Sequence, residues 1–216
     1  MTGDTPSAAQ LQGITDSFTR ELASLGRVRT YPKNTVFITE GDSSDSVFVI
    51  LSGRVKIFIS DSEGHEMILD IQGAGEYVGE MALDGKPRSA SVMTLEPSTF
   101  AVVAREPIRE AIRRNPDFAL DMISKIIDRA RIATSSVKDL ALLDVYGRVA
   151  RLLLNLSVEK EGKLLIPEKI TQQEIAERVG ASRDMVSRIF RDLSAGGYIT
   201  VENRFITINK KPPARW

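Results

Sequence analysis

Residues 117–145 contain neither glycine nor proline, so no helix-breaking residue interrupts them, and they restrict the fold more than any other segment. Apolar residues recur here at alternating steps of four and three, a heptad repeat typical of a two-stranded coiled coil. We predict a long helix that pairs with its copy in a homodimer; the alternative is a core helix packed on its own domain. Met122 and Ile127 lie off the repeat and are predicted to pack against that domain. The repeat consists of Ala119 and the predicted dimer contacts Ile123, Ile126, Ala130, Ala133, Val137 and Leu140.

The pattern over residues 27–104 is different, because apolar and other residues alternate there with a period of two, which indicates β-strands. Every second position is β-branched or leucine at Val47, Val49 and Leu51 and again at Val55, Ile57 and Ile59, and glycine-containing turns separate short strands roughly ten residues apart. This spacing favours a small β-sandwich or barrel-like roll. Ahead of it, residues 10–25 carry apolar side chains at three- and four-residue steps and predict one short amphipathic helix.

Two short helices are predicted near the C-terminus. Residues 171–174 read Thr-Gln-Gln-Glu, a capping box that opens a helix ending near Arg178. A tight turn containing Gly180 follows, and Ser182 caps a second helix over residues 183–194. Two helices joined by a short glycine-containing turn are the signature of a helix-turn-helix.

The segments around this motif complete a compact unit. A helix over 146–157 precedes it and is followed by a predicted loop over residues 158–163. After the stop at Gly196-Gly197, residues 198–201 and 205–209 are predicted to form a hairpin, the wing of a winged helix.

The second helix of the motif is the one that enters the major groove of DNA in helix-turn-helix proteins. Arginine reads guanine through two parallel hydrogen bonds, and a carboxylate accepts from the amino group of cytosine. The helical spacing assigns Arg183, Asp184, Ser187, Arg188 and Arg191 to its outer face, and Met185, Val186, Ile189, Phe190 and Leu193 to its inward stripe.

The charge distribution agrees with a nucleic-acid partner for this C-terminal unit. Residues 146–216 carry 13 lysines and arginines against 8 acidic residues, whereas residues 1–145 carry 16 against 21. The formal net charge of zero therefore combines a basic C-terminal third with an acidic body.

Composition also excludes several functional classes. The chain has no cysteine and a single histidine, His65, so iron–sulfur clusters and the usual cysteine or histidine metal sites are not expected. The sequence shows no nucleophile paired with a general base, so it does not suggest an enzyme. The first ten residues do not resemble a signal peptide and no apolar run is long enough to cross a bilayer, so a cytoplasmic protein without membrane contact is expected.

Four segments, read together, resemble a known family. They are GEMALDGKPRSAS (79–91), LALLDVYGRVARLLLNL (140–156), ITQQEIAERVGASRDMVSRIFRDL (170–193) and GGYI (196–199). Over nearly its whole length the chain resembles bacterial transcription regulators of the catabolite activator (cyclic-AMP receptor protein) and fumarate–nitrate regulator superfamily. The resemblance implies an α+β fold: a cyclic-nucleotide-binding β-roll over 1–116, a long dimerisation helix and hinge over 117–145, and a winged helix-turn-helix over 146–216.

In the cyclic-AMP-binding members of this family, the segment similar to residues 79–91 cradles the cyclic phosphate. The resemblance implies that Arg88 pairs with the phosphate, that Ser89 hydrogen-bonds it and that Glu80 accepts from the ribose 2′-hydroxyl. A guanidinium with a hydroxyl suits a phosphate, and a carboxylate suits a sugar hydroxyl. Without ligand, Arg88 is not expected to be a core residue. The implied effector contacts are Gly79, Glu80, Met81, Arg88, Ser89, Ala90, Ala133 and Thr134.

Two departures from the family pattern concern the identity of the effector. The loop between Glu80 and Arg88 is shorter than in the archetype. Of the two adjacent hydroxyl residues that contact the adenine there, only one has a counterpart, because the matching positions are Ala133 and Thr134. Cyclic AMP, cyclic GMP, a cyclic dinucleotide and an empty pocket all remain open.

The family resemblance also implies partners. A dimer is expected to bind a palindromic operator in double-stranded DNA, and the segment 158–166 corresponds to a region that contacts RNA polymerase in activators. The expected half-site is TGTGA-like, with a TTGAT-like half-site as the alternative because Ser187 precedes Arg188. The implied DNA contacts are Gln172, Gln173, Ser182, Arg183, Asp184, Ser187 and Arg188.

Overall fold

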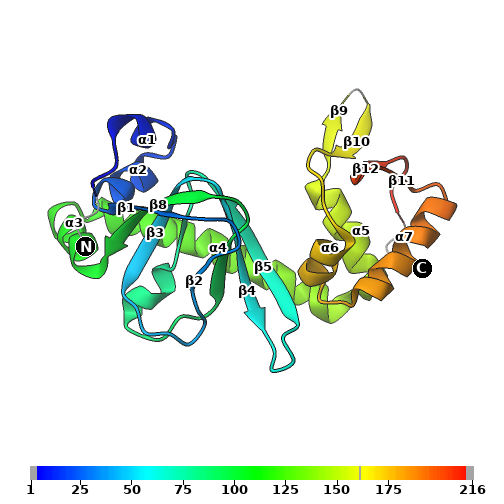
Figure 1. The fold of residues 1–216 in the computed structure, drawn as a ribbon, viewed down its shortest axis with the longest axis horizontal. Helices are drawn as coiled ribbons and strands as arrows, with labels where there is room; N and C mark the ends of the chain where they lie inside the picture. The colour runs from blue at the N-terminus through cyan, green and yellow to red at the C-terminus, as the bar shows by residue number, and fades with distance from the viewer. Residues whose placement is uncertain (1–3, 161, 213–216) are drawn as a thin grey trace. The chain divides into compact units, whose positions relative to one another are not determined.

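The computed structural model describes residues 4–160 and 162–212, which fall into two compact units (Figure 1). One unit comprises the residues up to Arg129 except Glu66–Ile68. The other comprises Glu66–Ile68 and the residues from Ala130 onward. The long helix α4 (Asp117–Leu142) contributes to both. None of the helices in these described residues is both long enough and apolar enough to cross a membrane.

The N-terminal unit contains a β-roll built from two four-stranded sheets, which confirms the predicted class. One sheet has the strand order β1-β8-β3-β6 and the other β2-β7-β4-β5, and the described pairings are antiparallel. The strands are β1 (Arg27–Tyr31), β2 (Val36–Ile38), β3 (Ser46–Ser52), β4 (Arg54–Ser60), β5 (Glu66–Gly73), β6 (Tyr77–Val78), β7 (Ser91–Thr94) and β8 (Ser98–Ala104).

Strand β3 is buried on both faces, which explains its unbroken apolar sequence. Phe48 and Ile50 belong to the cluster shared by the two sheets, together with Phe100 of β8. Val47 and Val49 belong to a second cluster, formed with helices and including Leu22, Tyr77 and Phe118. The roll is therefore covered by helices on one side of this strand and by its second sheet on the other.

The predicted single helix over 10–25 is wrong, because two helices occupy this region: α1 (Ala8–Gln12) and α2 (Ser17–Ser24). Gly13 is the C-cap of α1, and the Asp16 carboxylate caps α2 by accepting a hydrogen bond of 2.8 Å from the Thr19 backbone N–H. The strong N-cap at Asp16 starts a new helix in the middle of the apolar pattern. The N-terminal unit also contains the 3₁₀ helix η1 (Glu80–Asp84) and α3 (Arg105–Arg114).

Helix α4 buries only its first turns. Phe118 and Met122 are buried, the latter as predicted, but Ile127 is exposed, so its predicted packing against the domain is wrong. Met122 is the last buried apolar residue of α4 among the described residues, and the large apolar residues that follow it are at least 40% exposed. The exposed large apolar residues of α4 are Leu120, Ile123, Ile126, Ile127, Ile132, Val137, Leu140 and Leu142.

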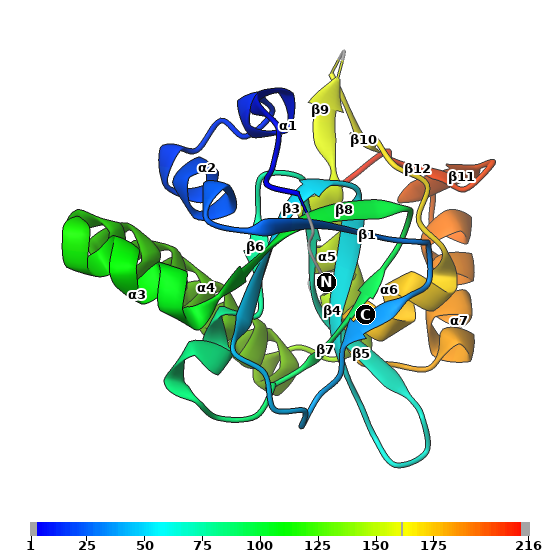
Figure 2. The same cartoon turned by 60° about the vertical axis from the view of Figure 1, so that its left-hand side comes forward.

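The C-terminal unit confirms the predicted winged helix-turn-helix. Helices α6 and α7 pack against each other and against α5, and β11 lies beside α7 (Figure 2). Its sheet has the order β11-β12-β10-β9. The elements are α5 (Val145–Leu156), β9 (Val158–Lys160), β10 (Lys163–Ile166), α6 (Gln172–Val179), α7 (Arg183–Ala195), β11 (Ile199–Glu202) and β12 (Phe205–Ile208).

The segment after Ser157 is not the predicted loop, because it forms the hairpin β9–β10. Its charged residues and Gly162 favoured a loop, but Leu164 pairs with Ile208 and Ile166 with Ile206 of β12. The apolar run of β10 thus extends the sheet of the wing, which no local signal at residues 158–163 indicates.

A break between helices lies within the segment 117–145, which is predicted to form the long helix and hinge. Helix α4 ends at Leu142, and Asp144 caps α5 by accepting a hydrogen bond of 2.7 Å from the Gly147 backbone N–H. Arg148 spans the break, since its Nη1 donates to the Leu143 carbonyl at 3.0 Å while its Nε donates to the Val179 carbonyl at 2.8 Å. One arginine thereby links the start of α5 to the end of α6.

Candidate effector site and DNA-binding surface

The turn at Gly79 opens the segment predicted to hold an effector. Gly79 has φ of +88°, a conformation that residues with a side chain rarely adopt. A Cβ atom here would lie 2.6 Å from Nη1 of Arg88 and 3.2 Å from the Ser46 carbonyl oxygen. Glycine is therefore required both by the backbone conformation and by the close approach of the arginine.

Arg88 is 6% exposed, so the expectation that it lies outside the core is wrong. Its Nη1 donates to the Gly79 carbonyl at 2.7 Å, and its Nη2 donates to the Ser46 carbonyl at 2.7 Å and to the Ser44 hydroxyl at 2.6 Å. Two backbone carbonyl oxygens and one hydroxyl oxygen of the chain itself thus accept hydrogen bonds from the guanidinium that is predicted to bind a ligand.

The neighbours of Arg88 leave this buried cation incompletely compensated. The oxygens that it contacts are uncharged, and its Nε has no hydrogen-bond partner among the described residues. Burial lowers the pKa of Arg88, although the nearby carboxylates of Asp45 and Glu80 oppose this shift. A buried charge without a hydrogen-bonded counter-ion is costly. An anion is consequently the ligand that the site accommodates best.

Glu80 has a partner that the sequence did not predict. Its carboxylate lies 2.8 Å from Nη1 of Arg129 on α4, with side-chain exposures of 11% for Glu80 and 24% for Arg129. Arg129 also donates to the Tyr77 carbonyl at 2.6 Å, and its guanidinium lies over the Tyr77 ring at 4.4 Å. These contacts fix α4 to the edge of the roll beside Glu80.

The titration behaviour of this cluster follows from its burial and charge. Burial lowers the pKa of Arg129, but the charge of Glu80 and their hydrogen bond outweigh it, so the pKa is raised overall. Burial also raises the pKa of Tyr77 to about 12. Tyr77 and Arg129 therefore each keep one protonation state across the physiological range.

The remaining predicted effector contacts differ in their exposure and in their hydrogen bonds. Ser89 is exposed and its hydroxyl donates to the Met81 sulfur at 3.1 Å, while Ala90 is buried. Ala133 and Thr134 are exposed on the part of α4 that belongs to the C-terminal unit, and the Thr134 hydroxyl donates to the Ala130 carbonyl at 2.9 Å.

The helix-turn-helix is fixed by local capping. The Thr171 hydroxyl accepts from the Glu174 backbone N–H at 3.1 Å, and the Ser182 hydroxyl accepts from that of Met185 at 3.2 Å. Only this half of the predicted capping box forms, because the Glu174 carboxylate pairs with Arg178 at 2.6 Å instead. Between the helices, Gly180 has φ of +61°, as the tight turn requires.

The predicted reading residues lie on the exposed face of α7. Arg183, Asp184 and Arg188 are exposed, and within the described part of the chain their side chains form neither hydrogen bonds nor ion pairs. Ser187 and Gln172 are half-buried, and the Gln173 amide donates to Glu177 at 2.9 Å. The charged side chains are thus free to contact an external partner.

Met185 does not belong to the inward stripe, which corrects the sequence prediction. It is 41% exposed, whereas the other predicted stripe residues are buried. Met185 is the third residue of α7, and the covering by α5 and α6 begins only at Val186. Helical periodicity assigns a residue to a face but does not indicate where along the helix that face becomes covered.

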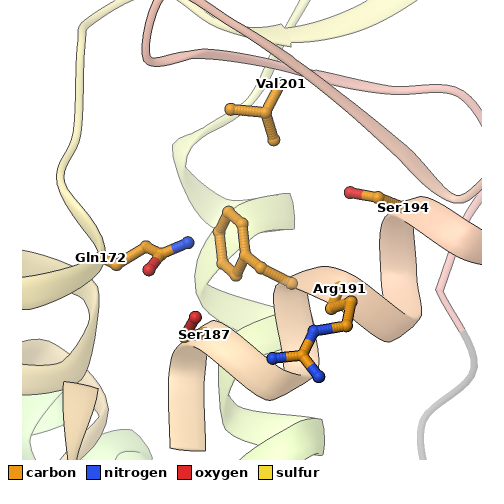
Figure 3. A pocket seen from close by; sticks show the side chains of 6 residues that line it. Gln172, Ser187, Arg191, Ser194 and Val201 are labelled. Carbon is orange, nitrogen blue, oxygen red and sulfur yellow. The ribbon is translucent and has the colours of Figure 1, made fainter. Parts of the chain in front are cut away.

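A cleft of about 270 Å³ runs along α7 on the side of the wing. Figure 3 shows the side chains of Gln172 and Ser187 near one end, Val201 across from them, and Arg191 along the helix. Its polar groups are an amide, hydroxyls and one guanidinium. The residues that line it are Gln172, Ser187, Phe190, Arg191, Ser194 and Val201.

Both units match known protein families. Residues 28–115 match the cyclic nucleotide-binding domain, and residues 147–212 match the Crp-like helix-turn-helix domain. The cAMP-activated global transcriptional regulator CRP of Salmonella typhimurium is 33% identical over 187 residues, which cover 84% of this chain and 89% of that protein. The chain belongs to the CRP/FNR superfamily of bacterial transcription regulators.

Other CRP/FNR members support this assignment. The CRP-like cAMP-activated global transcriptional regulator of Mycobacterium tuberculosis is 30% identical over 207 residues, covering 94% of this chain and 92% of that protein. Among solved structures, the c-di-GMP-responsive global regulator CLP of Xanthomonas campestris has a TM-score of 0.78 at 26% identity, covering 90% of this chain and all of that one. Its CRP/FNR membership makes the chain a DNA-binding transcription regulator with a cyclic nucleotide-binding domain.

Three features of this CRP/FNR regulator escaped the sequence reasoning: the Ser44 contact with Arg88, the Arg129 contact with Glu80, and the cleft beside Arg191. One signal was present for Arg129, because a cation on the predicted long helix stands one helical turn before Ala133. The Ser44 contact joins residues 44 positions apart, and no local pattern indicates it.

The ion pair between Glu80 and Arg129 is expected to stabilise the N-terminal unit. Arg129→Met leaves a largely buried carboxylate without its cation, so the free energy of unfolding should fall by about 1–3 kcal/mol. Adding Glu80→Gln should recover part of the loss, since it removes the uncompensated charge. Denaturant unfolding of the two single variants and the double variant measures this coupling. Arg131→Met, an exposed position on the same helix, is the control and should unfold like the wild type.

Proposed function

We propose that the protein is a homodimeric regulator whose affinity for a palindromic operator is controlled by a small anionic effector, a cyclic nucleotide, bound in the β-roll. The observation that carries this proposal is Arg88, a buried guanidinium whose contacts are uncharged oxygens and whose Nε is unused among the described residues. A cyclic phosphate supplies the charge that this site lacks.

The proposed effector contacts follow the chemistry of the loop. Arg88 binds the phosphate with help from the exposed Ser89 hydroxyl, and the backbone at Gly79 and Ala90 allows close approach. Glu80 accepts from the ribose hydroxyl while Arg129 holds its carboxylate in place. Met81 borders the site, and Thr134 contacts the base from α4, where Ala133 offers no second hydroxyl.

A cyclic dinucleotide is the alternative effector. It is supported by the structural similarity to the Xanthomonas regulator, which is described as responsive to c-di-GMP. A cyclic dinucleotide is also consistent with the missing hydroxyl at Ala133, because without that hydroxyl the base of the effector needs a different contact. Another signal, with no cyclic mononucleotide bound, is a further alternative. The effector titrations described in the Discussion separate these cases.

The proposed dimer is formed by α4. Its heptad repeat exposes Ile123, Ile126, Val137 and Leu140, and Ala130 and Ala133 complete one stripe along the helix. A soluble helix with this many exposed aliphatic side chains on a heptad repeat gains most by pairing with a second copy.

In the bacterial cytoplasm, the partners proposed for this dimer are double-stranded DNA and RNA polymerase. Two recognition helices related by a dyad read half-sites about 34 Å apart. Arg183 and Arg188 each select a guanine and Asp184 a cytosine. RNA polymerase is the further partner proposed for the exposed hairpin β9–β10, by analogy with the corresponding region of activators. Backbone phosphates are contacted by Gln172, Gln173, Ser182 and Ser187, and by Arg191 in the cleft.

Control by the effector requires a coupling between two sites. The break between α4 and α5 at Leu143–Asp144 is the proposed hinge, since a helix end can change direction with few altered dihedral angles. Effector binding at the roll and α4 would shift the population between two orientations of the winged helices.

Selection of binding sites from random DNA tests the DNA-reading part of this proposal. Arg188→Ala should weaken binding to the preferred site by about 1–3 kcal/mol and abolish the preference at one base pair. Gln173→Ala, a phosphate contact, should weaken binding to all sequences alike. The enriched half-site also decides between the TGTGA-like and TTGAT-like alternatives. If the Arg188→Ala protein enriches the same site with undiminished preference at every position, Arg188 does not read a base.

A further inference from the structure

An exposed methionine interrupts the polar surface of the recognition helix. Met185 lies in the first turn of α7 and follows directly on Arg183 and Asp184, which are also exposed. It is 41% exposed, although the neighbouring apolar residues of α7 pack into the core. Its backbone N–H is satisfied by the Ser182 cap, so the backbone that carries this side chain is fixed at the start of the helix.

The position of Met185 directs it toward DNA bases if α7 enters the major groove. The N-terminal residues of a recognition helix are the ones that reach the base edges. Met185 and Arg188 are three residues apart and share one side of α7, about 4.5 Å apart along the helix axis. This separation is close to one base-pair step of roughly 3.4 Å. If α7 enters the major groove, this spacing places Met185 beside the base pair next to the one assigned to Arg188.

The chemistry of methionine restricts what it can recognise there. Its thioether offers no hydrogen-bond donor and only a weak acceptor. The major-groove edges of the four bases present donors and acceptors, and the C5-methyl group of thymine is their one apolar feature. A flexible, polarizable side chain adapts well to such a small apolar group.

We infer that Met185 is a specificity-determining residue that selects a thymine beside the guanine read by Arg188, by packing its thioether on the thymine methyl group. This inference rests on the proposed DNA-reading role of α7 and adds an apolar contact to the polar contacts of Arg183, Asp184 and Arg188. It assigns to Met185 a role in base selection that neither charge nor hydrogen bonding can supply.

Replacing thymine by uracil removes this methyl group alone and so tests the inference. Once the preferred site is selected, its thymines are changed to uracil one at a time in one half-site, and binding of the full-length protein is measured. The wild type should lose about four-fold in affinity at one position, the size expected for one buried methyl group. At the other positions the affinity should stay unchanged.

Matched variants separate a contact with Met185 from an effect of uracil on the DNA itself. Met185→Gln, which keeps the length of the side chain, should bind the thymine and uracil sites equally at that position. Leu69→Ala, which truncates an exposed apolar side chain on β5, should keep the wild-type penalty. The inference is overturned if the wild type shows no uracil penalty in the half-site, or if Met185→Gln retains it. Failure of the wild type to bind any selected DNA would instead overturn the proposed function.

Discussion

The double variant Ile126→Asp, Val137→Asp is expected to sediment as a folded monomer and to lose operator binding. Both residues lie on the heptad repeat of α4 and are 43% and 64% exposed in a single chain. In a paired helix each aspartate faces like charge from the other copy, and the apolar burial of the pair is lost. Four lost aliphatic contacts weaken the dimer by at least about 4 kcal/mol, or roughly a thousand-fold.

A matched control separates loss of the interface from loss of the helix. Leu120→Asp, Ile132→Asp introduces the same number of charges at exposed apolar positions of α4 that lie off the repeat. This control should remain dimeric in analytical ultracentrifugation. Circular dichroism should show both variants folded, because the substituted side chains are not part of the core of either unit. A repeat variant that still sediments as a stable dimer would locate the interface elsewhere.

The elements that the sequence predicts well are those with local signals. The helix-turn-helix has its caps at Thr171 and Ser182 and its turn at Gly180, and each determines a backbone conformation within a few residues of itself. The predicted helices 171–178 and 183–194 accordingly match α6 and α7 within one residue. The long helix is also predicted by a local signal, because a segment that has a heptad repeat and neither glycine nor proline has few alternative structures.

The features that the sequence did not predict depend on distant partners. The hairpin β9–β10 forms because Leu164 and Ile166 pair with β12, forty or more residues away. The burial of Arg88 depends on carbonyl oxygens of residues 46 and 79, and the role of Arg129 depends on Glu80 in η1, which is distant in the sequence. Side-chain burial is a property of the assembled fold, so periodicity alone could not show that Met185 and Ile127 are exposed.

The structure changes the expected effect of substituting Arg88 on the free energy of unfolding. Because Arg88 is buried and donates to three oxygens, Arg88→Ala would leave a cavity and unpaired carbonyls, at a cost of about 1–3 kcal/mol. Arg88→Gln is the better test, since an amide can still donate to one carbonyl while the positive charge is removed. Effector binding is then compared between proteins that are both folded.

Arg88→Gln should weaken binding of any phosphate-containing effector by at least about 2 kcal/mol, or roughly 30-fold, because a charge-assisted pair with the phosphate is lost. Calorimetric titration with cyclic AMP, cyclic GMP and cyclic di-GMP identifies the effector in the wild type and measures the loss in the variant. Thermal unfolding provides a second readout, since a ligand that binds only the folded state raises the melting temperature as its concentration increases.

Ser44→Ala is the matched control for this prediction. It removes one of the oxygens that hold Arg88 internally, at 2.6 Å, without touching the guanidinium. A phosphate then competes with fewer internal acceptors, so the affinity of Ser44→Ala for the effector should equal or exceed that of the wild type. Equal binding of a cyclic nucleotide by wild type and Arg88→Gln would contradict the phosphate role of Arg88. A loss in Ser44→Ala as large as in Arg88→Gln would show that general disruption of the loop, rather than the missing charge, explains the effect.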